Sequence, residues 1–236
     1  MLEKIFKSAK LANEEIALVL SGLNNLHYKY HQKGFGGDLS SEADIVCEKI
    51  FCKHLLCFAD VFSEESGLIE SRHNTKVKNG RFILDPLDGS DNFLSNLLYY
   101  GSSLSFEIDG ITKFSIIYNY VEKSFVAKIE DKLIMSRSFS NRKIAIFERA
   151  YAYPRICQKL FENNIKFRSP GAVALSLANA RFFQFVLFFG HMREFDVRAG
   201  LHINSDLNIF HNGSFLLVSE DVLIFEQIKN LLLESL

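Results

Sequence analysis

Apolar residues recur at intervals of three and four between residues 2 and 31, and lysines and glutamates occupy many of the positions between them. This spacing predicts one long amphipathic helix over 2–31, with Gly22 as the position where it could break. A glycine-rich loop follows at 33–38. The capping pattern Ser41-x-x-Asp44 then predicts the start of a second helix that runs through Cys57.

The middle of the chain has a pattern typical of β-strands. Short apolar runs at 58–63 and 81–84 are each followed by acidic residues. From Gly101 to Met135, runs rich in β-branched and aromatic residues alternate with turn residues such as Asp109-Gly110, which predicts a series of antiparallel strands. The predicted strands are 102–108, 112–120, 124–129 and 132–135.

From residue 143 onward, predicted strands and helices alternate. The strands are 143–147, 165–168, 182–189 and 215–219, and the helices are 154–162, 172–181, 196–205 and 222–233. Such alternation favours a sheet flanked by helices. We therefore expect an N-terminal α+β domain at 1–140, with helices and an antiparallel sheet, and a C-terminal α/β domain at 141–236.

Composition and charge exclude several classes of protein. Hydrophobic residues make up 48% of the 236 residues and charged ones 23%, as in folded globular proteins. The net charge of −1 gives no general field for nucleic acid or anionic lipid. Residues 1–20 lack the continuous apolar core of a signal peptide, and the apolar stretch 182–192 is too short to span a bilayer. We expect neither a nucleic-acid polymer nor a membrane as a partner.

The cysteines indicate a reducing environment. They stand at 47, 52, 57 and 157, and this spacing fits neither a zinc finger nor a redox-active Cys-x-x-Cys pair. We therefore expect buried free thiols and a cytoplasmic location.

The segment 81–93 carries the most informative chemistry. An apolar strand delivers Asp85 at its carboxyl end, Pro86 turns the chain, and Gly89 frees the backbone before a helical turn. Asp85 and Asp88 would repel each other unless a cation lay between them, and oxygen-rich sites suit Mg²⁺, Mn²⁺ or Ca²⁺. The same residues also fit an Asp-rich surface turn, so the segment alone leaves both interpretations open.

Acidic residues after two other apolar runs favour the metal site. Glu64 and Glu65 follow the run 58–63, and Asp196 lies beyond the run 182–189. Carboxylates at the ends of three strands can converge on one site.

The turn after Asp85 offers further groups. The carbonyl of Leu87 could point inward as an additional oxygen ligand. The backbone amides of Gly89 and Ser90, at a tight turn that opens a helix, would be placed to bind a phosphate.

The run 85–93, Asp-Pro-Leu-Asp-Gly-Ser-Asp-Asn-Phe, resembles the signature of the lithium-sensitive, magnesium-dependent phosphatases that include inositol monophosphatase and fructose-1,6-bisphosphatase. The resemblance covers most of the chain in the right order. Its other matching segments are Ala43-Asp44, Glu64-Glu65, Arg168-Ser169 with Gly171-Ala172, and 195–200. It implies the layered α-β-α-β-α sandwich of the sugar phosphatases, an inositol monophosphatase-like phosphomonoesterase and sensitivity to lithium. The implied substrate is a small phosphorylated polyol or sugar, and a homodimer is left open.

The resemblance also implies a role for each matching residue. One metal would be held by Glu64, Asp85 and the Leu87 carbonyl, and a second by Asp85, Asp88 and Asp196. Two or three Mg²⁺ ions would occupy each active site, with Mn²⁺ as a substitute. The residues assigned to catalysis are Asp44, Ser90 and Glu64, with Asp44 orienting the Ser90 hydroxyl toward the attacking water. Those assigned to phosphate or substrate are Gly89, Ser90, Asp91 and, from its place in the glycine loop, Lys33. Glu65 would lie beside the ligands.

Several positions depart from the family pattern. Phe188-Phe189-Gly190 stands where the family has an acidic, substrate-recognising residue, Phe195 replaces a tryptophan, and Arg198 replaces a small residue. These departures leave more than one class of substrate open. A phosphatase for fructose 1,6-bisphosphate or 3'-phosphoadenosine 5'-phosphate is the alternative enzyme, and a catalytically inert metal-binding or regulatory scaffold is the alternative from another class.

Two residues have a structural alternative to a functional role. Asp44 could serve only as a helix cap. His191 could contact substrate, but a lone histidine in an aromatic segment is more often packed in the core.

Overall fold

The computed structural model describes residues 1–22, 30–37, 39–73, 77–135 and 141–234. The helices are, in chain order, α1 (Leu2–Ser21), α2 (Glu42–Leu55), α3 (Ser90–Leu94), α4 (Pro154–Glu162), α5 (Val173–Ala178), α6 (Glu194–Ile203) and α7 (Val222–Leu233), with the short 3₁₀ turns η2 (Ala150–Ala152) and η3 (Ala180–Phe182). The strands are β1 (Tyr30–Lys33), β2 (Leu39–Ser41), β3 (Asp60–Ser63), β4 (Gly67–Ile69), β5 (Gly80–Asp88), β6 (Gly101–Ile108), β7 (Ile111–Asn119), β8 (Ser124–Ile129), β9 (Lys132–Met135), β10 (Ala145–Glu148), β11 (Phe167–Arg168), β12 (Val186–Phe189), β13 (Asn208–His211) and β14 (Phe215–Ser219).

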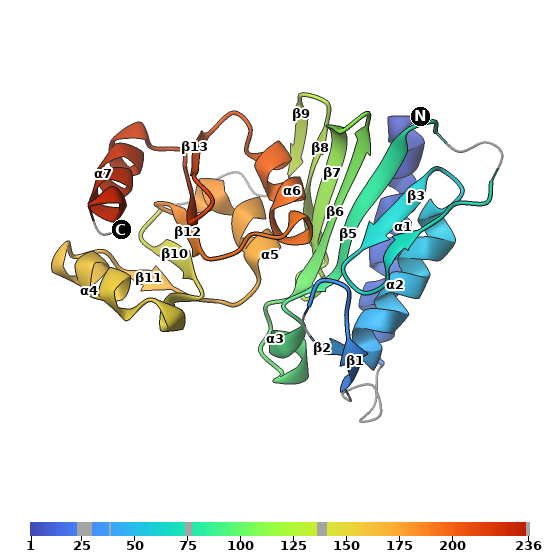
Figure 1. The fold of residues 1–236 in the computed structure, drawn as a ribbon, viewed down its shortest axis with the longest axis horizontal. Coiled ribbons are helices and arrows are strands. Elements are labelled where there is room, and N and C mark those ends of the chain that lie inside the picture. The colour runs from blue at the N-terminus through green and yellow to red at the C-terminus, as the bar shows by residue number, and fades with distance from the viewer. Residues whose placement is uncertain (23–29, 38, 74–76, 136–140, 235–236) are drawn as a thin grey trace.

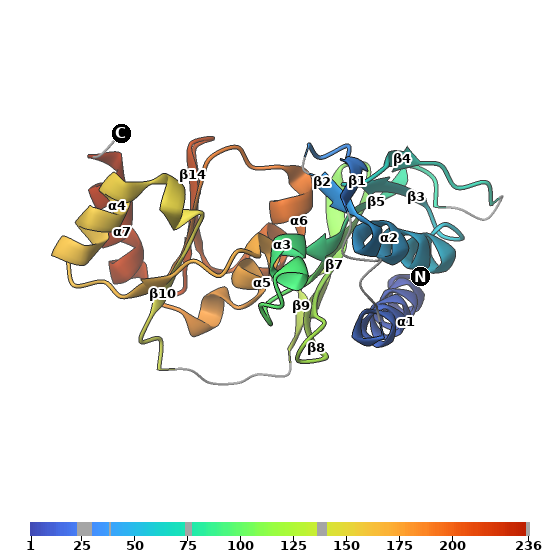
Figure 2. The same ribbon diagram turned by 90° about the horizontal axis from the view of Figure 1, so that it is seen from below.

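These elements stack in alternating layers of helices and sheets (Figure 1). α1 and α2 cover one face of a seven-stranded sheet of order β4-β3-β5-β6-β7-β8-β9, in which β3 and β5 are parallel. α5 and α6 lie between that sheet and a five-stranded sheet of order β11-β10-β12-β14-β13. Figure 2 shows α4 and α7 on the outer side of the smaller sheet, opposite the end that carries α1 and α2. The predicted α-β-α-β-α sandwich is confirmed.

Aromatic side chains fill the core between the first helical layer and the larger sheet. Phe51 on α2 packs in one cluster with Phe82, Phe106 and Phe114 of the sheet, and all four are fully buried. Burial of one such side chain contributes roughly 1.5–3 kcal/mol. The smaller sheet has its own aromatic core beneath α4 and α7. Each sheet is therefore held from its outer side by apolar packing.

The layer between the sheets contains two further buried apolar clusters, and polar contacts add to them in positioning α6. The ring nitrogen Nδ1 of His202 on α6 lies 2.9 Å from the hydroxyl of Ser115 on β7. The ammonium group of Lys128 on β8 donates to the hydroxyl of Ser205, just beyond α6, at 2.6 Å. These contacts fix α6 against the larger sheet.

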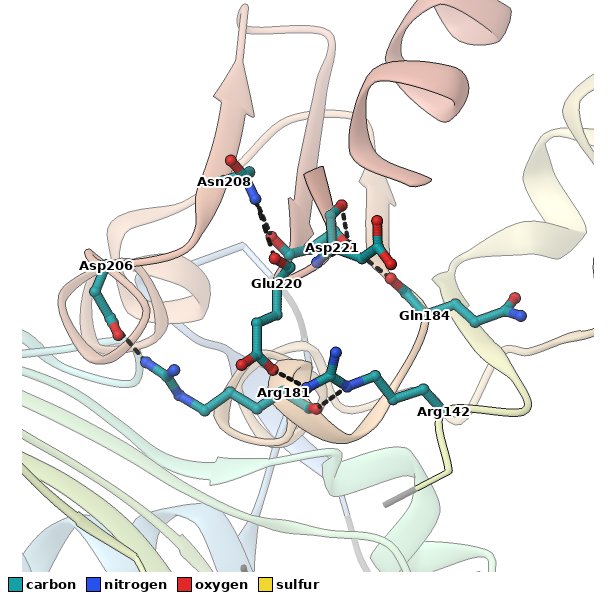
Figure 3. A network of polar contacts seen from close by, with 8 residues as sticks. Arg142, Arg181, Gln184, Asp206, Asn208, Glu220 and Asp221 are labelled. Carbon is teal, nitrogen blue, oxygen red and sulfur yellow. Dashed lines mark hydrogen bonds and ion pairs between the residues drawn. The ribbon is translucent and has the colours of Figure 1, made fainter. Parts of the chain in front are cut away.

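A polar network holds the start of the smaller sheet (Figure 3). Nε of Arg142 donates to the carbonyl oxygen of Arg181 at 3.0 Å, and its Nη2 pairs with Glu220. Arg181 in turn pairs with Asp206 at 2.5 Å, and the Asn208 amide donates to the Glu220 carbonyl at 3.3 Å. The network ties the chain before β10 to η3 and to the segment after β14.

The predicted elements agree with the structure except at the N-terminus, at short edge strands and at 182–185. The strand predicted over 182–189 was too long, because η3 ends at Phe182 and β12 begins only at Val186. The bounds of α4, α7, β8, β9 and β14 are those predicted. The helix predicted over 2–31 breaks at Gly22, the position singled out in the sequence, because α1 ends at Ser21 with Gly22 as its C-cap. The end of the predicted helix was wrong: Tyr30 and His31 belong to β1, which pairs antiparallel with β2 across the glycine loop. The predicted domain boundary between 140 and 141 lies beside residues 136–140, outside the described part of the chain, and the division into two domains stays a prediction.

None of the helices in the described ranges is both long and apolar enough to cross a membrane. All four cysteines are free thiols, as predicted. Cys47 is buried, but Cys57 is exposed, so the expectation that all of them are buried was wrong.

Candidate active site

Two acidic residues meet at the carboxyl ends of parallel strands. β3 and β5 pair with Ser63 opposite Leu84, and the Glu64 amide donates to the Leu84 carbonyl at 3.0 Å. Glu64 and Asp85, the next residues on the two strands, are therefore neighbours at one edge of the sheet. Both are buried, with 8% and 4% of their surface exposed.

The turn after Asp85 is a break in the strand ladder. Between Asp85 and Asp88 the pairing of β5 with β6 shifts in register, as in a β-bulge, which re-aims side chains. The Leu87 amide donates to Oδ1 of Asp85 at 3.0 Å. Gly89 then adopts φ +81°, and a Cβ there would lie only 3.0 Å from the Tyr99 carbonyl oxygen. Only glycine fits this turn without strain.

Asp196 completes the acidic cluster from the helical layer. It lies in the first turn of α6, after a strand of the other sheet, so it does not come from a third strand at the same sheet edge, as the sequence suggested. One carboxylate oxygen from each of Glu64, Asp85 and Asp196 can be chosen so that all three lie within 4.8 Å of one another. Such hard oxygen donors fit Mg²⁺ or Mn²⁺.

The buried carboxylates of the cluster have too few positive charges around them to balance their own. Burial, and then the neighbouring Glu64 carboxylate, raises the pKa of Asp85 well above its ordinary value. Burial likewise raises the pKa of Asp88 to about 8, although the Leu175 amide donates to Asp88 Oδ2 at 2.9 Å. A guanidinium already lies against two members: Arg193 pairs with Glu64 at 2.7 Å and with Asp196 at 2.8 Å. The negative charge of the cluster therefore favours binding of a further cation, as a metal site requires.

The cluster opens into a cavity of about 650 Å³. Most residues singled out from the sequence line it, namely Asp44, Glu64, Glu65, Asp85, Leu87, Asp88, Gly89, Ser90, Asp91 and Asp196. Lys33 is exposed and is not among the described residues that line the cavity. Its assignment to substrate stays a prediction without support from this geometry.

Asp44 forms a helix cap at the cavity wall. Its Oδ2 accepts from both the amide and the hydroxyl of Ser41, each at 2.6 Å, and the Ser41 hydroxyl accepts from the Asp44 amide. This capping box begins α2, as predicted. Burial raises the pKa of Asp44 to about 6. Within the described part of the chain, no hydrogen bond joins Asp44 to Ser90, although both line the cavity.

The glycine loop packs on the segment that carries Glu64. The amide of Gly36 donates to the Glu64 carbonyl at 2.7 Å, and a Cβ on Gly36 would lie 2.6 Å from Glu64 Cγ. Glu65 accepts a hydrogen bond from Ser40. Burial, and then the negative charge of Asp44, raises the pKa of Glu65 to about 7. The loop thus closes over the two glutamates.

Two polar residues that the sequence analysis missed hold the opposite wall. Glu148, at the end of β10, is fully buried and accepts from the Gly171 amide at 2.9 Å and the Ser176 hydroxyl at 2.5 Å. The amide of Asn92 donates to the carbonyls of Tyr99 and Pro170, each at 2.7 Å. Glu148 directly follows a buried apolar run, as Asp85 does, and that position was the signal available in the sequence.

Basic side chains lie on the C-terminal side of the cavity. Arg149 and His191 are exposed and line the cavity. The guanidinium of Arg149 lies beside Gly190, because its Nη1 would be 3.5 Å from a Cβ atom added to that glycine. The expectation that His191 packs in the core was wrong, because β12 ends before it. Phe189, by contrast, is buried beneath α4 and α7.

We expect the metal-free protein to lose thermal stability as the pH rises from about 5 to about 8. A carboxyl group whose pKa is raised on folding stabilises the folded state fully below its unfolded value, near 3.9, and loses this effect as the pH rises through the folded value. For Asp88 the folded value is about 8, and Glu65 acts in the same direction with a value of about 7. Thermal unfolding in EDTA at a series of pH values measures the slope.

Saturating Mg²⁺ should remove the dependence of thermal stability on pH, since the bound metal neutralises the negative charge of the ionised carboxylates. Asp88→Asn should flatten it in EDTA. A metal-free protein whose stability rises from pH 5 to pH 8 would contradict the charge distribution described above.

Comparison with known proteins identifies the family that this chain matches. Residues 1–206 match the inositol monophosphatase family. The Nus factor SuhB of Escherichia coli K12 is 26% identical over 137 residues, which are 50% of this chain and 49% of that protein, so the chain spans about half the length of this relative.

Two solved structures share the fold. The extragenic suppressor protein SuhB from Bartonella henselae has a TM-score of 0.77 at 20% identity, covering 98% of this chain and 97% of that one. An inositol monophosphatase–fructose 1,6-bisphosphatase also has a TM-score of 0.77, at 17% identity and 98% coverage of both chains. At these identities the likeness shows the fold alone.

Proposed function

Since the chain belongs to the inositol monophosphatase family, we propose that it is a magnesium-dependent phosphomonoesterase acting on a small polyol or sugar monophosphate. Inositol monophosphate is the reference substrate, and the reaction would take place in the cytoplasm. The observation that supports this most is the convergence of Glu64, Asp85 and Asp196 at a cavity large enough for a small phosphate ester.

The acidic residues are proposed as the metal ligands. Glu64, Asp85 and the Leu87 carbonyl would hold one Mg²⁺, and Asp85, Asp88 and Asp196 a second. When bound, Mg²⁺ supplies positive charge that neutralises the phosphoryl group and lowers the pKa of water. Lithium sensitivity follows from the resemblance and stays a prediction.

The remaining roles belong to groups at the turn and beside it. The amides of Gly89 and Ser90 are proposed to hold the phosphate. The Ser90 hydroxyl has one proton to donate and lone pairs to accept, so it can donate to Asp44 while its oxygen accepts a proton from the attacking water. For this the Asp44 carboxylate must reach Ser90 while it still caps α2.

A panel of phosphate esters assayed with Mg²⁺ and with EDTA tests the proposal. We expect release of inorganic phosphate from at least one sugar or polyol monophosphate, and none in EDTA. Release that is equal in EDTA would reject a metal-dependent reaction.

One observation favours a bisphosphate as a second candidate substrate. The wall made by the C-terminal part of the chain presents Arg149 and His191 to the cavity, and Phe189, where the family has an acidic residue, is buried in the core. An acidic wall suits the hydroxyl groups of inositol, whereas a basic one suits a second phosphate. Fructose 1,6-bisphosphate and 3'-phosphoadenosine 5'-phosphate carry such a group.

We expect Arg149→Gln to separate the two substrate classes. Loss of a charged hydrogen bond to a second phosphate should raise KM for a bisphosphate about tenfold, while KM for inositol monophosphate should change little. Steady-state kinetics on both esters measure this. Arg168→Gln is the control, since Arg168 is an exposed arginine of the same part of the chain that is not among the described residues lining the cavity. Equal effects of Arg149→Gln on both substrates would reject a second phosphate at this wall.

A regulatory scaffold is the competing proposal from another class. The Escherichia coli relative is named a Nus factor, a name that states no phosphatase activity. A protein that binds Mg²⁺ at the acidic cluster but releases phosphate from none of the esters would favour the scaffold.

A further inference from the structure

The side chain of Arg193 lies inside the acidic cluster. Its Nε and Nη2 donate to the two carboxylate oxygens of Asp196 at 2.9 and 2.8 Å, and Nη1 pairs with Oε1 of Glu64 at 2.7 Å. Nη1 also donates to the Gly36 carbonyl at 3.3 Å. One guanidinium therefore joins the two carboxylates that come from β3 and α6.

A divalent cation at this cluster would need the same atoms. Both Asp196 oxygens and one Glu64 oxygen already accept from Arg193, and the planar fork of a guanidinium fits such a pair of oxygens closely. Two cations sharing these oxygens would repel each other. Arg193 and a metal ion therefore compete for Glu64 and Asp196.

The cavity offers room for the side chain of Arg193 once it leaves the carboxylates. Arg193 is 24% exposed and borders the cavity, so its guanidinium can leave the carboxylates by rotating into the cavity without unfolding of α6. Its backbone lies at the N-terminal boundary of α6, just before the helical residues.

We infer that Arg193 is a tethered cation that neutralises the empty cluster and must be displaced by the metal, so that it sets the metal affinity of the site. This inference rests on the proposed function for the existence of the metal site. Only the fraction of molecules with Arg193 displaced can bind the ion, and the apparent affinity is reduced by that fraction. Substitution of Arg193 should therefore tighten metal binding.

A purely structural role predicts the opposite sign. If Arg193 only holds Glu64 and Asp196 in position, its loss would leave the ligands disordered and weaken metal binding. The direction of the change in affinity thus distinguishes the two roles, whatever happens to turnover.

Calorimetric titration of metal-free protein with Mg²⁺ tests the inference. For Arg193→Gln we expect Kd to fall about tenfold, within the usual range for linked binding events. Arg198→Gln is the matched control: it removes the same charge from the same helix, and Arg198 pairs with Glu194 at 3.4 Å, not with the cluster. Its Kd should change far less. Arg193→Lys keeps the positive charge but lacks the planar guanidinium that binds two oxygens at once. Its Kd should lie between those of the unsubstituted protein and Arg193→Gln.

Thermal unfolding supplies a second readout. Arg193→Gln should lower the melting temperature in EDTA, because Glu64 and Asp196 then lack the counter-charge of Arg193, and Mg²⁺ should raise it by more than in the unsubstituted protein. An unchanged or higher Kd in folded Arg193→Gln or Arg193→Lys would overturn the inference alone. Binding of Mg²⁺ by Arg193→Gln but not by the unsubstituted protein would show that Arg193 excludes the metal permanently, and no binding by any form would overturn the metal site and the proposed function together.

Discussion

Asp85→Asn is expected to abolish phosphate release while the protein stays folded. Asp85 is the carboxylate proposed to serve both metal ions, and it lies with Glu64 and Asp196 in the buried cluster. Asparagine has nearly the same volume, and its side-chain oxygen can still accept from the Leu87 amide, which donates to Asp85 Oδ1 at 3.0 Å. Turnover should fall by more than the roughly 10²- to 10³-fold that loss of one electrostatic contact costs.

The metal-free Asp85→Asn protein should be at least as stable as the unsubstituted one. The raised pKa of Asp85 shows that its charge is unfavourable in the empty cluster, so removal of the charge relieves repulsion. Asp109→Asn is a matched control, because Asp109 lies in the turn between β6 and β7 at φ +51°, a conformation that asparagine tolerates. Near-normal phosphate release by folded Asp85→Asn would reject the two-metal assignment.

Loss of either Asp44 or Ser90 is expected to have the second-largest effect. If the two residues position the attacking water together, Asp44→Asn or Ser90→Ala should each lower kcat by roughly 10²- to 10⁴-fold with little change in KM. The double variant should cost little more than the worse single one, because residues that act as a unit are not additive. Steady-state kinetics on the four proteins measure this cycle.

The helix-cap role of Asp44 needs its own control. Ser41→Ala removes the hydroxyl that exchanges hydrogen bonds with Asp44 but leaves Ser90 untouched. It should lower stability by about 0.5–2 kcal/mol, the usual cost of a lost cap, and leave kcat almost unchanged. If Asp44→Asn behaves like Ser41→Ala, Asp44 is a cap alone, and additive rate losses in the cycle would likewise reject the pair.

The elements with a clear period or stop signal were predictable. α4 begins at Pro154, a residue favoured in the first helical turn, and α7 repeats apolar residues at helical spacing, and both have the predicted bounds. Strands β4 and β13 have three and four residues and lie at sheet edges, where the pattern is too short to show alternation. β1 depends on pairing with β2, which no local pattern reveals.

The chemistry of the turn at Asp85 was readable because its residue types are constrained. Gly89 must adopt positive φ, and Asp85 follows a buried apolar run directly before the β-bulge, so both leave a mark in the sequence. Arg193 leaves none: it stands three residues before Asp196, but only the packing of α6 against β5 and β6 brings its side chain to Glu64. His191 was misassigned because its aromatic neighbours belong to a strand that ends before it.

The most direct test follows metal occupancy and phosphate release in one Mg²⁺ titration of the unsubstituted protein, with the ester that the panel identifies. If the acidic cluster is the active site, phosphate release should be absent in EDTA and should rise with the same midpoint as the binding of Mg²⁺ measured by calorimetry. Phosphate release that is undiminished in EDTA, or Mg²⁺ that binds fully without any ester being hydrolysed, would contradict a metal-dependent phosphomonoesterase.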